Sequence, residues 1–231
     1  MKANFSSDSG YLFAALTVLI WSGFVVVSRM GATGTLTPYD ISALRLGTAA
    51  LVLAPWWLPR LLIPERRQLQ WYQGLSLALL AGITYPLASY IGFQYAPASH
   101  GAVLISGMLP FFTSIFASRL LGERPSRIRF LGLTLILTGV LTLLFTQMNV
   151  QSFGQSTLKG DLLLLAASCF WSLFTVLIKY WRLKAFDVSL GVTAISAMMY
   201  LPVFFLFLPS HLAIASTQDI ALQAFYQGFI V

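Results

Sequence analysis

The stretch from Ala98 to Arg129 constrains the fold of this chain most strongly. Its first part is an apolar segment of about 20 residues with Pro110 near the middle, long enough to cross the roughly 30 Å hydrocarbon core of a bilayer as a helix. An arginine-rich run, Gly122–Arg129, follows it. An interior proline leaves a helix carbonyl without its partner, and in a membrane such a carbonyl must face other helices or a water-lined cavity. The stretch therefore predicts a membrane-spanning helix that bends at Pro110.

The composition of the whole chain agrees with this interpretation. Hydrophobic residues make up 58% of the chain and charged residues only 9%, whereas charged residues make up about 25% of a soluble domain. We therefore predict an all-α polytopic membrane protein with seven full spans and part of an eighth, which begins at Asp219. The full spans are expected at about residues 11–30, 41–58, 71–94, 98–121, 130–146, 161–178 and 188–208.

The basic residues predict how the chain is oriented. The net charge is +7 at pH 7, but the 14 lysine and arginine residues occur in short runs between apolar spans and form no basic face. With the N-terminus in the cytoplasm, most of these runs fall in cytoplasmic loops, as the positive-inside rule requires. We therefore predict a cytoplasmic N-terminus and no nucleic-acid partner. Glu123 and Arg124 lie in one of these loops and are expected to form a structural ion pair.

The sequence carries no motif for catalysis or metal binding. Cys169 is the single cysteine, and His100 and His211 lie in separate segments, so they suggest no metal-ligand set. No phosphate-binding loop and no nucleophile with its base is recognisable. We therefore expect no catalytic residue, no metal and no cofactor, and the chain is not expected to be an enzyme.

Two parts of the chain resemble each other. The matching segments are Gly10–Arg29 with Gly160–Lys179, including Trp21-Ser22-Gly23-Phe24 with Trp171-Ser172-Leu173-Phe174, and Tyr39-Asp40-Ile41-Ser42 with Phe186-Asp187-Val188-Ser189. Five spans separate the copies, so they cross the membrane in opposite directions, as in the inverted repeats of secondary transporters. We predict a first five-helix unit over residues 1–146, a linker over 147–159 and a partial second unit over 160–231. A second unit of equal length would continue well past Val231, so we expect a truncated chain.

Several short motifs together resemble the EamA-type branch of the drug/metabolite transporter superfamily. They are Trp21-Ser22-Gly23-Phe24, Leu44-Arg45-Leu46, Leu109-Pro110-Phe111-Phe112, Leu121-Gly122-Glu123-Arg124-Pro125-Ser126, and Gly132 with Gly139. The resemblance implies a ten-span secondary transporter of the bacterial inner (plasma) membrane that exports small metabolites, amino acids or drugs by alternating access. The expected partners are a small-molecule substrate and the lipid bilayer, with a homodimer left open. The alternative is a non-transporting membrane remnant or a lipid-carrier accessory protein, because the last spans are missing.

Arg45 and two tryptophans are the first candidates for a substrate site. Arg45 is the one basic residue well inside a span, where an arginine costs about 2.5–3.5 kcal/mol, so it should face the bundle or a water cavity. There it would attract an anionic group such as a carboxylate, or else it reaches towards Asp40 at the outer end of its span. Trp21 and Trp171 are paired by the repeat. They either line a central cavity from both halves or serve as interfacial and packing aromatics.

Two tyrosines and two further residues complete the candidates. Tyr85 and Tyr90 place hydroxyl groups at mid-depth of the third span, where they either line the cavity or pack against neighbours. Pro110 has an expected mechanical role as a hinge, with a fixed kink as the alternative. His100, at the outer start of the fourth span, is either a titrating group that couples to protons or a solvated capping residue.

The acidic residues of the spans all lie at span ends. Asp40, Asp161 and Asp187 occupy these positions, and no carboxylate is found at mid-span. Coupling of transport to protons through a membrane-embedded carboxylate is therefore not predicted from the sequence.

Overall fold

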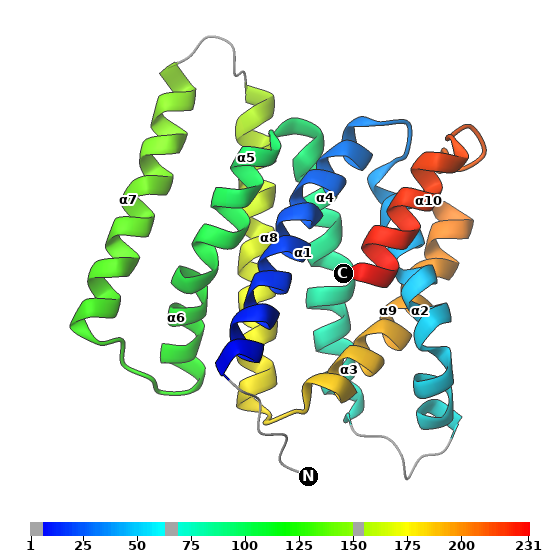
Figure 1. Cartoon of the computed structure of the whole chain (residues 1–231), viewed down its shortest axis with the longest axis horizontal. Coiled ribbons are helices and arrows are strands. Elements are labelled where there is room, and N and C mark those ends of the chain that lie inside the picture. Colours follow the sequence, from blue (N-terminus) through cyan, green and yellow to red (C-terminus); the bar gives the residue numbers. More distant parts are fainter. Residues whose placement is uncertain (1–6, 63–68, 150–154) are drawn as a thin grey trace.

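The computed structural model describes residues 7–62, 69–149 and 155–231, and all regular elements in these ranges are helical (Figure 1). The elements labelled α are α-helices and those labelled η are wider π-helical segments. They are α1 (Ser7–Thr33), α2 (Pro38–Leu62), α3 (Trp71–Leu77), η2 (Ala78–Thr84), α4 (Tyr85–Tyr95), α5 (Ala98–Gly101), η3 (Ala102–Gly107), α6 (Met108–Leu120), α7 (Arg127–Asn149), α8 (Gln155–Tyr180), α9 (Ala185–Phe207), α10 (Thr217–Phe225) and η4 (Tyr226–Ile230).

Six stretches of the described residues are long and apolar enough to cross a membrane, which confirms the prediction of an all-α polytopic membrane protein. They are Gly10–Thr33, Pro38–Arg60, Trp71–Tyr95, Ala98–Leu120, Ser156–Tyr180 and Ala185–Phe207. Helix α7, the fifth predicted span, is not among the six, so the count of seven and the five-helix repeat stay predictions. Residues 1–6 and 63–68 of the predicted first unit, including part of a predicted basic loop, and residues 150–154 of the predicted linker lie outside the described residues.

The helices are arranged so that the two halves of the chain interleave. Helix α8 packs against α4 and α6, and α9 packs against α2. In Figure 1, α1 and α8 run in opposite directions, and so do α2 and α9. This arrangement is the one that an inverted repeat predicts, because α8 and α9 carry the sequence matches of α1 and α2.

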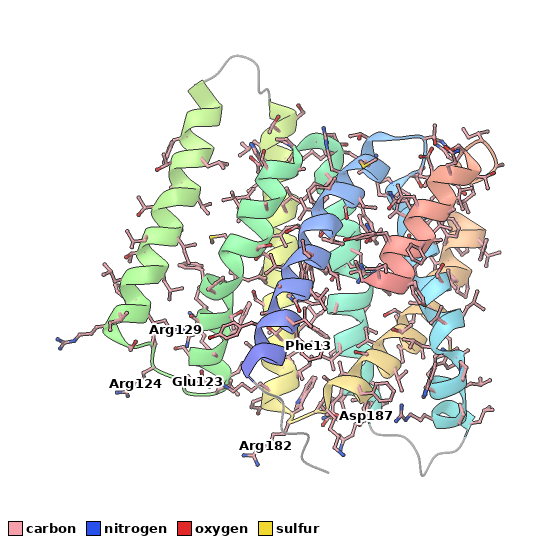
Figure 2. The ribbon with its side chains drawn as sticks, viewed as in Figure 1. Phe13, Glu123, Arg124, Arg129, Arg182 and Asp187 are labelled. Atoms are coloured by element: carbon pink, nitrogen blue, oxygen red, sulfur yellow. The ribbon has the colours of Figure 1, made fainter. Side chains whose placement is uncertain are left out.

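The loops at one end of the bundle carry charged residues. Glu123, Arg124, Arg129, Arg182 and Asp187 all lie at the end where the chain begins (Figure 2). The predicted pair of Glu123 with Arg124 is replaced by a pair between the Glu123 carboxylate and the Lys179 ammonium of α8. Adjacent residues in an extended loop do not face each other, whereas the end of α8 lies across from the loop.

The third and fourth spans are each interrupted by a π-helical segment just before a proline. Segment η2 precedes Pro86, and η3 ends three residues before Pro110. Proline lacks the backbone N–H, so a carbonyl of the preceding turn has no helical donor, and π-helical turns of this kind often occur at functional sites. The bend predicted at Pro110 therefore coincides with a local change of helix type.

Serines from the second half of the chain donate hydrogen bonds to the backbone of these two segments. The Ser168 hydroxyl of α8 donates to the Ile105 carbonyl of η3 at 2.8 Å, and the Ser196 hydroxyl of α9 donates to the Ala78 carbonyl of η2 at 3.3 Å. Gly82 makes the second contact possible, because a Cβ atom there would lie 1.8 Å from the Ser196 Oγ. Both serines are fully buried. Each irregular turn of the first half is thus held by one hydroxyl of the second half.

Candidate functional site

An aromatic cluster lies where α1, α4 and α8 meet. The rings of Trp21 and Trp171 are 5.4 Å apart between centroids in an edge-to-face arrangement, and the Tyr85 ring is 4.7 Å from that of Trp171. Phe24 stacks on Tyr85 at 6.1 Å. Such contacts add about 0.5–1.5 kcal/mol per pair to the area that they bury. Three of the five predicted site residues, one of them from the second half of the chain, are therefore in mutual contact.

The other two predicted residues, Arg45 and Tyr90, lie behind this cluster. The Tyr90 ring is 6.4 Å from that of Phe24, and the Arg45 guanidinium carbon is 6.0 Å from the centroid of the same ring. The Arg45 charge also acts electrostatically on both Tyr85 and Tyr90. Arg45 consequently faces the bundle interior, as the cost of exposing an arginine to lipid predicts, and its structural role lies with the aromatic residues rather than with Asp40.

A cleft of about 710 Å³, which we call the aromatic cleft, opens between α1 and the α5–η3–α6 span. Trp21, Tyr85 and Trp171 line it, whereas Arg45 and Tyr90 do not. All its lining residues are uncharged, and those with polar side-chain groups are Thr17, Trp21, Ser22, Tyr85, Ser99, Ser106 and Trp171. The volume lies within the range of about 300–1,000 Å³ that small-molecule sites occupy. The aromatic cleft therefore suits a small solute with an apolar body.

Two polar atoms beside the aromatic cleft have no partner among the described residues. The Tyr85 side chain is fully buried and its hydroxyl oxygen makes no hydrogen bond, and the Arg45 Nη1 atom is likewise buried and unpaired. Leaving a buried polar group unsatisfied costs about 1–3 kcal/mol, and more for a charged one. Because Tyr85 lines the cleft, a bound solute or water could satisfy its hydroxyl at the site.

Two glutamines that the sequence analysis did not single out continue the polar network. The Tyr90 hydroxyl donates to Gln227 Oε1 at 3.1 Å, and Gln227 Nε2 donates to the Ser28 hydroxyl at 3.0 Å. One turn earlier, Gln223 Nε2 donates to the Val27 carbonyl at 3.0 Å. The signal in the sequence is the spacing of four between two amides in an apolar segment, which places both on one helix face.

His100 lies in a different environment from the solvated one that the sequence analysis left open. Its side chain is 3% exposed, and its Nδ1 atom lies 2.7 Å from Oδ1 of Asp161 on α8, which is 2% exposed. Asp161 is buried although it lies at the end of a span, because α4 and α5 cover that end of α8. A buried acid is therefore present, contrary to the expectation that none would be available for coupling.

The remaining candidates concern mechanics and metals. Pro110 is the third residue of α6, and Ser114 donates to the Pro110 carbonyl at 2.7 Å; its role as a hinge stays a prediction. In the described parts of the chain, no three His, Cys, Asp or Glu side chains are grouped so that they could hold a metal ion.

Comparisons with known proteins give a family match, a relative and a solved structure of similar fold. The EamA-like transporter family matches residues 8–145. An uncharacterized transporter of Archaeoglobus fulgidus is 28% identical over 170 residues, which are 72% of this chain and 56% of that protein, so the chain spans little more than half of the relative's length. A solved crystal structure superposes with a TM-score of 0.61 at 19% identity, over 96% of this chain and 75% of the other, which shows a shared fold.

Proposed function

The chain belongs to the EamA-like transporter family, and on that premise we propose that it is a secondary transporter of the bacterial inner membrane that exports a small metabolite, amino acid or drug. The observation that carries the proposal is the aromatic cleft, whose lining residues include Tyr85 with its unpaired, buried hydroxyl. A pocket with many apolar walls and few convergent polar groups is the usual form of a small-molecule site. The family assignment also favours transport over the non-transporting alternative.

Each of the five candidate residues has a role in this proposal. Trp21 and Trp171 contact the apolar part of the solute from one side, and Tyr85 hydrogen-bonds to a polar group on it. Arg45 lies outside the cleft and contributes positive potential, which attracts an anionic group in this poorly solvated region. Tyr90 holds its position through Gln227.

Alternating access follows from the way that the two halves share the site. Trp21 and Tyr85 come from the first half and Trp171 from the second, so a rocking motion between the halves would open the aromatic cleft to either side of the membrane. The N-terminus is cytoplasmic in this proposal, because the basic loops then lie on the cytoplasmic side.

An accumulation assay tests the proposal. Bacterial cells that express the chain are loaded with radiolabelled amino acids or with the cationic dye ethidium, and the retained amount is compared with that in cells carrying an empty vector. We expect the chain to lower the retained amount of at least one solute, and we expect Trp171→Ala to abolish this difference. Trp56→Ala is the matched control, because Trp56 is 53% exposed on α2 and does not line the cleft. Equal retention of every solute with and without the chain would refute the proposal.

A further inference from the structure

We propose that the buried His100–Asp161 pair is the proton-binding site that couples solute transport to the proton gradient; this inference rests on the proposed transport function. The pair joins the halves of the chain, since His100 is on α5 and Asp161 is on α8. Its 2.7 Å contact and its nearly complete burial make it a defined site rather than a surface ion pair.

Burial restricts the number of protons that the pair can hold. A lone charge in a poorly solvated interior is costly, whereas a hydrogen-bonded pair with a net charge of zero is tolerated. The protonated pair therefore has no net charge, and the deprotonated pair, with a net charge of −1, is the costlier form while α5 and α8 stay packed. When water reaches the pair, the imidazole and the carboxylate can exchange protons with it independently.

The charged groups nearest to this end of the bundle have other contacts. The Arg29 guanidinium of α1 donates to the Phe93 carbonyl on α4. The Lys159 ammonium of α8 lies 4.9 Å from the centre of the Tyr95 ring of α4. Segment η3, which begins two residues after His100, contains no titratable side chain. His100 is the charged partner that contacts Asp161 directly.

The seam beside the pair is closely packed. A Cβ atom at Gly160 would lie 2.7 Å from the backbone nitrogen of Ala96, and one at Gly101 would lie 2.3 Å from the Phe93 ring. These two glycines are the chain neighbours of Asp161 and His100. Water therefore has little room to enter while α4, α5 and α8 are packed as described, and access to the pair requires these helices to move.

The same helices that carry the pair also form the aromatic cleft. Ala98 and Ser99, next to His100, line the cleft, and α8 carries both Asp161 and the cleft residue Trp171. A displacement of α5 against α8 consequently changes the shape of the cleft and the access of water to the pair together. By thermodynamic linkage, a solute that favours one arrangement then changes the proton affinity of the pair, and the proton changes the solute affinity by the same factor.

The proton step itself is simple. On the side where water reaches the pair, the N–H bond of the imidazolium breaks, the electron pair stays on the ring nitrogen and the proton passes to water. On the other side the nitrogen takes a proton from water by the reverse step. One proton thus crosses for each full cycle, and no oxidant or reductant is required.

The first test is a titration that needs no transported solute. The chain has only two histidines, so labelling histidine with ¹³C at Cε1 gives two NMR signals in lipid nanodiscs, and His211→Gln assigns them. Spectra are recorded from about pH 4 to about pH 9. We expect the His100 signal to change with pH and Asp161→Asn to alter this response, while the His211 signal behaves as in the wild-type chain. A His100 signal that does not change across this range in the wild-type chain would overturn the proposal, whether or not the variants fold.

The second test separates coupling from transport. Proteoliposomes contain the chain and the pH-sensitive dye pyranine, and the solutes are the labelled amino acids and ethidium. For each variant we divide the amount of solute that accumulates under a pH gradient by the rate of solute-for-solute exchange without a gradient. This ratio measures coupling independently of the transport rate. We expect this ratio to fall at least tenfold in His100→Gln and in Asp161→Asn, and to stay within twofold in His211→Gln. An unchanged ratio in both pair variants refutes the coupling alone, whereas a wild-type chain that exchanges none of the solutes refutes the transport function as well.

Discussion

The Tyr90 hydroxyl and the Gln227 side chain, which are 137 residues apart, form a buried hydrogen bond of 3.1 Å. Gln227 also donates to the Ser28 hydroxyl at 3.0 Å, so one amide joins α1, α4 and η4. Because Tyr90 lies beside Arg45 and the aromatic cluster, this bond positions the wall behind the aromatic cleft. The last helical segment of the chain is thereby part of the site's support.

Replacing Gln227 should destabilise the fold. In Gln227→Leu the Tyr90 and Ser28 hydroxyls each lose a buried partner, and we expect a loss of about 1–3 kcal/mol in the free energy of unfolding. Thermal unfolding in detergent measures the effect. Gln218→Leu is the control, since Gln218 is exposed at the start of α10. Equal unfolding temperatures for the two variants would show that the network contributes nothing to stability.

Gly82→Ala should disturb the contact between η2 and α9. The new methyl group would lie 1.8 Å from the Ser196 Oγ atom, so the helices must separate, and overpacking of this kind costs about 1–3 kcal/mol. The double variant Gly82→Ala with Ser196→Gly should recover part of the loss in a detergent unfolding assay. Gly139→Ala is the control, because nothing lies within 4 Å of its added Cβ. If the double variant is no more stable than Gly82→Ala alone, steric overlap with Ser196 is not the cause.

Pro110→Ala tests the hinge. The alanine supplies the backbone N–H that proline lacks and favours a regular helix in place of η3. We expect the chain to reach the membrane in normal amounts but the rate of solute exchange in proteoliposomes to fall about tenfold. Pro125→Ala, in the loop before α7, should have the wild-type rate. A wild-type rate in Pro110→Ala would favour the fixed kink over the hinge.

The pair of Glu123 with Lys179 should give a small pH-dependent stability. The Lys179 ammonium holds the pKa of the Glu123 carboxyl below its usual value of 4.5. A lowered carboxyl pKa stabilises the fold above the unfolded-state pKa, and this contribution is lost as pH falls through the folded-state pKa. We therefore expect Lys179→Met to lower the unfolding temperature at pH 6 and to have no effect well below pH 4.5. Lys184→Met, on an exposed loop residue, should have no such pH dependence, and a difference that persists in acid would contradict the assignment.

The spans and the aromatic part of the site could be predicted because they depend on local patterns. Twenty apolar residues cross a bilayer whatever their neighbours are. An intramembrane arginine must face the bundle, so the interior position of Arg45 follows from its charge alone. The proximity of Trp21 and Trp171 is what the predicted repeat leads us to expect, since residues paired by an inverted repeat are brought to the central interface. Their role in binding stays a prediction.

The polar pairs could not be predicted because their partners are far apart in the sequence. His100 and Asp161 both resemble solvated residues at span ends, and only the packing of α5 on α8 buries them together. In the sequence, Gln227 looks like a surface residue of a short segment. Its buried position becomes apparent only from the packing of η4 against α1. The π-helical form of η2 and η3 is also absent from any local pattern, since the prolines predict a bend but not the type of turn.

The serine contacts of η2 and η3 have a consequence for how the chain enters the membrane. The third and fourth spans leave the ribosome before Ser168 and Ser196 have been synthesised, so the Ile105 and Ala78 carbonyls lack these donors at that stage. The two serine contacts therefore form only after α8 and α9 have entered the membrane. Protease sensitivity of ribosome-bound chains should therefore fall as α8 and α9 emerge, and constant sensitivity would argue against this order. The packing of the third and fourth spans is thus completed only when α8 and α9 of the second half are in the membrane.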